Sequence, residues 1–182
     1  MVTRSFGLTD ADLGCAESEH ANAFALWQRA KEAENECLKA NARTHRRQRG
    51  QPLLVVVDDE PVVAITLAEI LRRNGNIAVW FTEPLRALDY LGEGPVDLLL
   101  SDITMPAMDG VSLAAKAHAV RPSCEILLLS ALAQEMEVME RVAKLGIKVQ
   151  LELKPLRVPC LLLKIDRLLV AGKMNWAVAA RL

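Results

Sequence analysis

The sequence predicts an α/β fold: a five-stranded parallel sheet, doubly wound with helices on both faces and preceded by a long N-terminal helix. Two observations carry this prediction. From residue 53 onward, short apolar runs alternate with helix-length segments, and the runs are apolar throughout rather than at every second position. Alternating strands and helices favour parallel strands joined by right-handed crossovers. Continuous apolar runs are typical of strands that are covered on both faces.

Five runs of this kind are expected to form the strands: Leu53–Val57, Ile77–Phe81, Val96–Leu100, Glu125–Leu129 and Val149–Leu153. The helix after the first run has one apolar face, made of Val63, Leu67, Ile70 and Leu71, and Asn74-Gly75 is expected to end it. Thr82 is expected to cap the second helix, with Pro84 in its first turn and Gly92 after its end. The remaining helices are expected after Asp109-Gly110, at about 133–145 and at about 159–169.

Residues 1–52 form a different region, which we interpret as a helical extension followed by a basic linker. Residues 17 to about 43 are rich in Ala, Glu and Lys and lack Gly and Pro, which predicts one long helix. Apolar residues, most of them small, follow a spacing of three and four positions, typical of a weak heptad seam: Ala23, Leu26, Ala30, Ala33, Cys37 and Ala40. Two interpretations stay open, a helix folded back on its own domain and a helix that mediates homodimerisation or docking. Residues 43–52 are interpreted as a solvated linker, 53–170 as the main domain and 171–182 as a tail.

Composition excludes several classes of function. The chain has 22 basic and 23 acidic residues among 182, and a net charge of −1 gives no overall attraction to nucleic acid or an anionic membrane. The four cysteines are far apart, which favours reduced thiols rather than a metal site or a disulfide framework. No secretory signal or membrane-spanning run of about 18 residues is apparent. We therefore expect a cytoplasmic protein that binds neither nucleic acid nor membrane.

Polar side chains follow the ends of four expected strands. Asp58 and Asp59 follow the first, Asp102 the third, Ser130 the fourth and Lys154 the fifth. Ligands of doubly wound sheets bind beyond the carboxyl ends of the strands, where the strand order reverses. Carboxylates gathered there repel one another, by roughly 4 kcal/mol for a pair about 4 Å apart at an effective dielectric of about 20. Such a site requires a cation, shifted pKa values, or both.

In this order and at these positions, the residues resemble those of a response-regulator receiver domain from two-component signalling. The resemblance covers residues 53 to about 170 and implies a flavodoxin-like (βα)5 fold. It implies that Asp102 accepts a phosphoryl group from a sensor histidine kinase or phosphotransfer protein. It also implies Mg²⁺, bound directly by Asp59, Asp102 and the Thr104 carbonyl and through water by Asp58. Lys154 would pair with the phosphoryl oxygens, and the Ser130 hydroxyl would respond to them.

The expected function is thus a phosphoacceptor domain that catalyses only its own phosphorylation and dephosphorylation. With no DNA-binding output domain expected after residue 170, its signal would pass to an unknown downstream protein through protein contacts. One departure from the family is Leu151, three residues before Lys154, where an aromatic residue usually stands. This departure favours a second hypothesis, a degenerate receiver that acts as a scaffold through its N-terminal helix. A third, an aspartyl-phosphate phosphatase, requires a second acid two residues after the nucleophile, where Thr104 stands.

Overall fold

The computed structural model describes residues 10–131 and 135–179 of the chain. The chain divides into two compact units, residues 1–37 and 38–182, which are considered separately below. In the first unit, every described residue belongs to helix α1 (Asp10–Arg49), whose last twelve residues belong to the second unit. None of the helices in the described ranges has both the length and the apolar character needed to cross a bilayer.

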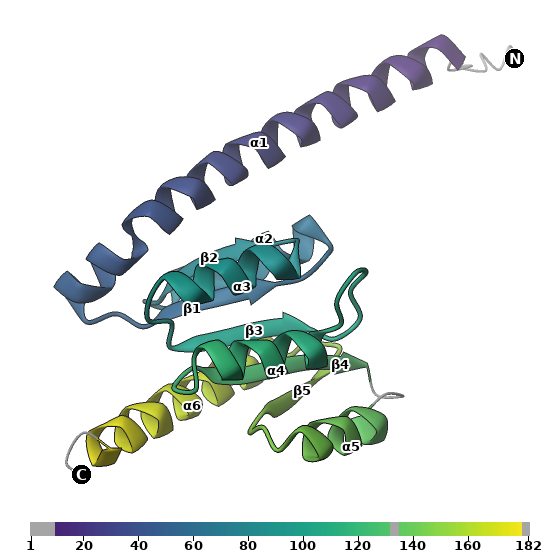
Figure 1. The fold of residues 1–182 in the computed structure, drawn as a ribbon. Helices are drawn as coiled ribbons and strands as arrows, with labels where there is room; N and C mark the ends of the chain where they lie inside the picture. The colour runs from purple at the N-terminus through teal and green to yellow at the C-terminus, as the bar shows by residue number, and fades with distance from the viewer. Residues whose placement is uncertain (1–9, 132–134, 180–182) are drawn as a thin grey trace, which may run out of the picture. The chain divides into compact units, whose positions relative to one another are not determined.

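The second unit is built on one five-stranded parallel sheet with the strand order β2-β1-β3-β4-β5 (Figure 1). Its strands are β1 (Leu53–Val57), β2 (Ile77–Phe81), β3 (Leu98–Asp102), β4 (Glu125–Ala131) and β5 (Gln150–Lys154). The chain first moves outward from β1 to β2 and then returns to β3 on the other side of β1. The order therefore reverses between β1 and β3, which confirms the doubly wound, flavodoxin-like fold.

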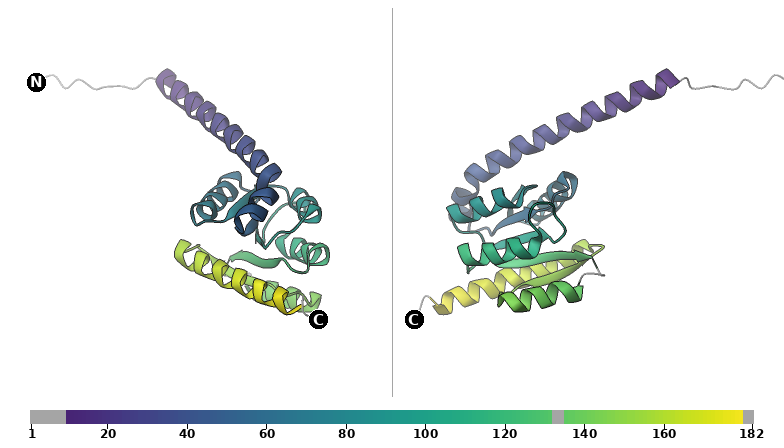
Figure 2. Two further views of the ribbon diagram at one scale, coloured as in Figure 1. Left: turned by 90° about the vertical axis from the view of Figure 1, so that its left-hand side faces the viewer. Right: turned by 45° about the vertical axis from the view of Figure 1, so that its right-hand side comes forward.

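Helices cover both faces of this sheet (Figures 1 and 2). One face packs against α2 (Pro61–Arg73) and α6 (Val158–Ala179), and the other against α3 (Pro84–Glu93), α4 (Gly110–Val120) and α5 (Glu135–Leu145). In β1, Leu54 and Val56 point to the first face and Leu53, Val55 and Val57 to the second, and all five are buried. The continuous apolar runs of the central strands thus reflect burial on both faces.

The outermost strand, β5, departs from this pattern. Gln150 is exposed, and the other four residues of the strand are only half-buried. An edge strand has one free side and less cover, so alternating polar residues such as Glu152 are tolerated there. The expectation that all five strands are apolar throughout is therefore wrong for β5.

Several boundaries differ from those expected. β3 begins and ends two residues later, so Asp102 is its last residue. Glu83, with extended backbone angles and no side-chain capping bond, precedes α3, so the expected Thr82 cap is wrong. Helix α1 extends over 10–49, which makes most of the basic stretch helical rather than a linker. Helix α6 continues to Ala179, past the expected end at about residue 169.

The last turns of α1 form part of the second unit. Ala42 is completely buried in the core beside α3, and Leu38 packs against the same cluster. The Arg43 guanidinium lies 4.4 Å from the centre of the Tyr90 ring, and the Lys39 ammonium lies 4.2 Å from that of Phe81. Cations over aromatic faces contribute about 0.5–2 kcal/mol each, depending on desolvation. The sheet domain therefore includes residues N-terminal to its first strand.

Two arginines from neighbouring elements hold the C-terminus of α3. Arg43 Nη2 donates to the Tyr90 carbonyl at 2.9 Å, and Arg121 Nη2 donates to the Leu91 carbonyl at 3.0 Å. The last carbonyls of a helix have no partner within it, so these side chains satisfy groups that would otherwise need water. The α3 C-cap, Gly94, has no side chain, and a Cβ there would collide with the Arg43 side chain. A larger residue at this position would therefore require the Arg43 side chain to shift.

Candidate functional site

The register of the central strands aligns two of the acids. Val57 of β1 pairs with Ser101 of β3, so the next residues, Asp58 and Asp102, reach the carboxyl edge of the sheet at the same level. Adjacent strands are about 4.8 Å apart, which places the two carboxylates in close proximity. Asp58 is only 2% exposed and Asp102 only 7%, so neither charge is fully solvated. Two buried carboxylates this close require a counter-charge.

Lys154, the last residue of β5, supplies this counter-charge. Its ammonium lies 2.7 Å from Asp102 Oδ1 and 3.8 Å from Asp58 Oδ2, so one cation serves both carboxylates. Burial alone would lower the pKa of Lys154, but its hydrogen bond to Asp102 and the negative charges around it outweigh burial and raise the pKa. The Lys154-Pro155 peptide is cis. Lys154 is thus held in its charged form against the two acids.

Asp58 is only partly satisfied by this arrangement. Its Oδ1 accepts a hydrogen bond from the Glu60 backbone N–H at 3.0 Å, whereas its buried Oδ2 has no hydrogen-bond partner. Burial raises the pKa of Asp58, and the Glu60 N–H and Lys154 only partly offset this, while Asp102 and Asp59 raise the pKa further. A buried carboxylate oxygen without a partner is costly. The site is therefore short of positive charge.

The phosphoacceptor candidate, Asp102, has both carboxylate oxygens engaged. Lys154 holds Oδ1, and the Thr104 backbone N–H donates to Oδ2 at 2.8 Å. The segment after Asp102 folds back tightly, because the Gly110 N–H donates to the Ile103 carbonyl at 2.9 Å. A Cβ at Gly110 would collide with the Asp102 carbonyl oxygen, so only glycine fits there.

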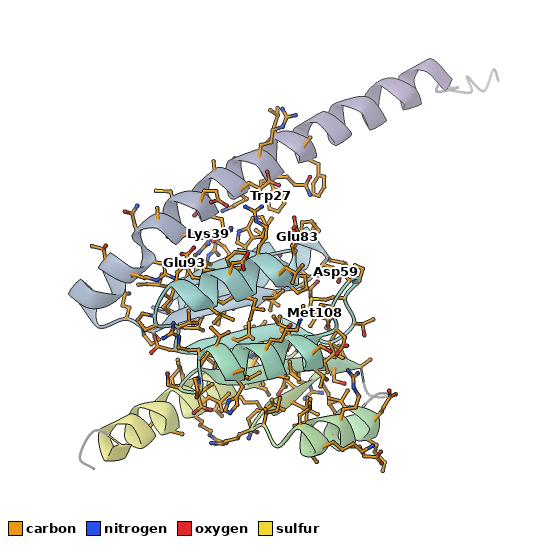
Figure 3. The ribbon with its side chains drawn as sticks, viewed as in Figure 1. Trp27, Lys39, Asp59, Glu83, Glu93 and Met108 are labelled. Atoms are coloured by element: carbon orange, nitrogen blue, oxygen red, sulfur yellow. The ribbon has the colours of Figure 1, made fainter. Side chains whose placement is uncertain are left out.

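The remaining predicted site residues lie at the same edge but make other contacts. Asp59 is half-buried at the end of β1 (Figure 3). The fully buried Ser130 hydroxyl donates to the Ala131 carbonyl at 3.1 Å rather than to Asp102. Leu151 is half-buried and packs against an apolar cluster that includes Val138 of α5. The structure thus unites Asp58, Asp102 and Lys154 in one ion-pair network and places Ser130 at its border.

The residues present suit a hard divalent cation. Among the described residues, no group of three or more His, Cys, Asp and Glu side chains is arranged to hold a metal ion. Mg²⁺, however, prefers oxygen ligands, keeps several of its waters and commonly uses only one or two carboxylates. The buried Asp58 Oδ2, which has no hydrogen-bond partner, can accept a hydrogen bond from a metal-bound water beside Asp102. The donor set and its deficit of positive charge therefore fit this ion.

Sequence reasoning missed one pair of residues at this edge, Asp109 and Arg141. Asp109 was interpreted only as preceding a helix, yet its carboxylate also accepts a 2.8 Å hydrogen bond from Arg141 Nη2 of α5. The N-cap role could have been recognised from the Asp-Gly pair that begins α4. No sequence pattern identifies Arg141 as the partner of Asp109, because the two residues are 32 positions apart.

Comparison with known proteins agrees with this geometry. The family model of the response regulator receiver domain matches residues 54–166. The Fimbriae Z protein of Salmonella typhimurium is 34% identical over 79 residues, which are 42% of this chain and 38% of that protein. The response regulator receiver protein CpdR of Brucella abortus is 31% identical over 80 residues, 44% of this chain and 67% of that protein.

Solved structures show the same fold. The CheY-like receiver domain protein of Methanospirillum hungatei superposes with a TM-score of 0.62 at 23% identity, over 69% of this chain and 98% of that chain. The family match covers more than half of the sequence and includes all five strands except the first residue of β1, Leu53. The chain therefore belongs to the response regulator receiver family of two-component systems.

Proposed function

We propose that Asp102 is the phosphoacceptor of this receiver domain. The observation that carries the proposal is the contact between Lys154 and Asp102 beside the buried Asp58. The phosphodonor would be a phosphohistidine on a sensor histidine kinase or a phosphotransfer protein. An Asp102 carboxylate oxygen forms the new bond to phosphorus, the phosphorus–nitrogen bond of the phosphohistidine breaks, and the imidazole leaves with that electron pair.

The residues around Asp102 have distinct roles in this reaction. Phosphoryl transfer needs positioning and charge neutralisation more than covalent assistance. Lys154 neutralises charge on the phosphoryl oxygens, and the Thr104 N–H holds the second carboxylate oxygen in place. Asp59, Asp102 and the Thr104 carbonyl would hold Mg²⁺ directly, with Asp58 supporting it through water. When bound, Mg²⁺ supplies the further positive charge that the transferring group requires.

Ser130 is the proposed sensor of the phosphorylated state. A phosphoryl group adds about −1.5 to −2 charge and three acceptor oxygens. The Ser130 hydroxyl now donates to a neighbouring backbone carbonyl, a bond between neutral groups. Hydrogen bonds to charged groups contribute about 1.5–3 kcal/mol, against about 1 kcal/mol for neutral ones. Phosphorylation would therefore draw the hydroxyl toward the phosphoryl oxygens and move the end of β4.

Phosphorylation of the purified protein tests this proposal. Incubation with acetyl phosphate and Mg²⁺ should add one phosphoryl group to the intact mass. Asp102→Asn should abolish the gain, whereas Asp89→Asn, on the exposed face of α3, should leave it unchanged. An unchanged wild-type mass would contradict the proposal and favour the alternative, a degenerate receiver that serves as a scaffold. Mass gain that persists in Asp102→Asn would place the reaction elsewhere.

We further propose that α1 mediates contact with a second copy of this chain. Leu26, Ala30, Ala33 and Cys37 are all exposed and follow the three- and four-residue spacing of a coiled-coil seam. Leu26 in particular leaves 62% of its surface uncovered. Such seams pair with identical seams in parallel dimers. Sedimentation of the full chain should show a dimer that Leu26→Glu dissociates, and a monomer in both cases would contradict this proposal.

A further inference from the structure

The ion pair between Asp109 and Arg141 joins two segments that border the acidic site. Asp109 lies seven residues after Asp102, at the N-cap of α4, and Arg141 lies in the middle of α5. Arg141 Nη2 is 2.8 Å from Asp109 Oδ1. The same oxygen accepts backbone hydrogen bonds from Val111 and Ser112, at 3.0 and 3.1 Å. Arg141 thus binds a carboxylate whose position is already fixed by backbone hydrogen bonds from the first turn of α4.

Asp109 is coupled to the phosphoacceptor by the chain between them. The next residue, Gly110, donates its N–H to the Ile103 carbonyl and approaches the Asp102 carbonyl so closely that no side chain fits. The segment 103–109 is therefore a closed loop with Asp102 at one end and Asp109 at the other. Within this loop lies Thr104, whose N–H holds Asp102 Oδ2. This loop offers a path by which a shift of Asp109 can reach the hydrogen bonds of the phosphoacceptor.

Arg141 is also well placed to move with α5. Val138 and Val142 of α5 pack on Ile103, Val111 and Ala114, which belong to the loop and to α4. The ion pair reinforces this small apolar contact from the solvent side, with the Arg141 side chain 39% exposed and that of Asp109 36% exposed. Ion pairs at this exposure are weak and reversible. Such a contact can be formed or lost without unfolding either helix.

We propose that Arg141 is a positioning residue: through Asp109 it ties the loop 103–109 to α5, so that events at Asp102 are transmitted to α5. The inference rests on the proposed phosphorylation of Asp102. The contact between Asp109 and Arg141 would transmit the phosphorylated state to α5 without an aromatic side chain at position 151. Leu151 at that position packs against the apolar cluster that includes Val138. The coupling free energy is reciprocal. A phosphoryl group on Asp102 that changes the conformational equilibrium of α5 is therefore itself stabilised or destabilised, by the same free energy, when α5 changes.

Hydrogen exchange of the full chain tests the inference, measured with and without beryllofluoride and Mg²⁺ as a mimic of the phosphoryl group. In the wild type, amide exchange should change in both the loop 103–109 and α5. Arg141→Ala should keep the change in the loop and reduce the change in α5 by up to about fivefold, the size that a half-exposed ion pair can contribute. Arg141→Lys, which retains the charge, should restore it.

Two further variants distinguish transmission from general loosening. Asp109→Asn keeps an effective N-cap but removes the charge, so it should reproduce Arg141→Ala, and the double variant should be no worse than either one. Lys144→Ala, an exposed cation on the same helix, should behave like the wild type. An α5 response that is unchanged in Arg141→Ala would overturn the inference alone. No response anywhere in the wild type, and no mass gain with acetyl phosphate, would overturn the proposed function and the inference together.

Discussion

The ammonium of Lys154 lies 2.7 Å from Asp102 Oδ1, although the two residues end strands separated in the sheet by β4. The side chain of Lys154, which pairs with Ala131 in the sheet, therefore extends across the end of β4 to reach the acids. Because this cation also lies 3.8 Å from Asp58, it is the shared counter-charge of the site. The contact therefore joins the counter-charge of the acidic cluster to the proposed phosphoacceptor.

Removal of the Lys154 charge should weaken the fold and the chemistry together. Lys154→Gln leaves Asp58 and Asp102 to repel each other, so we expect the free energy of unfolding to fall by about 1.5–3 kcal/mol, the usual contribution of a hydrogen bond to a charged group. Urea denaturation measures this change. Lys148→Gln, an exposed residue just before β5, is the matched control and should be neutral. Equal stabilities of the two variants would show that Lys154 does not balance the acids.

Neutralisation of Asp58 should have the opposite effect on stability. Its Oδ2 is buried without a hydrogen-bond partner, and Asp58→Asn removes a charge that the fold tolerates poorly. We expect the metal-free protein to gain roughly 0.5–2 kcal/mol, as is common when strain at a functional site is relieved. Stabilisation by added Mg²⁺ should be lost in the same variant. Thermal unfolding with and without Mg²⁺ reports both effects, and a less stable metal-free variant would contradict this account.

Acidification should weaken Mg²⁺ binding at a pH above the ordinary pKa of an aspartate. Burial raises the pKa of Asp58 from 3.8, and its protonated form cannot serve the metal. The folded state therefore takes up this proton more readily than the unfolded state does. As the pH falls through the raised pKa, Mg²⁺ affinity should decrease while the Asp58 contribution to metal-free stability increases. Calorimetric Mg²⁺ titrations across this range measure the affinity, which should be insensitive to pH if Asp58 takes no part.

The end of α1 should contribute to the stability of the sheet domain through Arg43. Gly94→Ala would force the Arg43 side chain away from Tyr90 and Glu93, with a cost of about 1 kcal/mol, comparable to the loss of one exposed cation–aromatic contact. In an Arg43→Ala background the same glycine substitution should cost nothing. A double-mutant cycle by urea denaturation measures this coupling. Strictly additive effects would show that Arg43 and Gly94 act independently.

The sequence predicted the fold well where local pattern and burial agree. β1 and β2 were predicted to the residue, because each is a short apolar run bounded by turn signals. β5 was placed one residue early and wrongly given the pattern of a fully covered strand, because its position at the edge of the sheet follows from the order of all five strands. The end of α1 was interpreted as a linker because a basic stretch is typical of solvated chain. The contacts of its cations with Phe81 and Tyr90 depend on the tertiary structure and have no local sequence pattern.

The same reasoning applies to the site. Asp58, Asp102 and Lys154 could be predicted because parallel strands bring their carboxyl ends to one edge. The pair formed by Asp109 and Arg141 could not, since it depends on how α5 packs against α4. The hydrogen bond from the Ser130 hydroxyl to the Ala131 carbonyl could not be predicted either, because the sequence does not tell which acceptor a hydroxyl at the end of a strand takes.

The most direct test of aspartyl phosphorylation at this site is the backbone amide spectrum of the full chain, recorded with beryllofluoride and Mg²⁺. We expect shifts centred on Asp102, Thr104 and Ser130, which Asp102→Asn and omission of Mg²⁺ both abolish. An unchanged spectrum, or shifts that survive in Asp102→Asn, would contradict the claim that this carboxylate accepts the phosphoryl group.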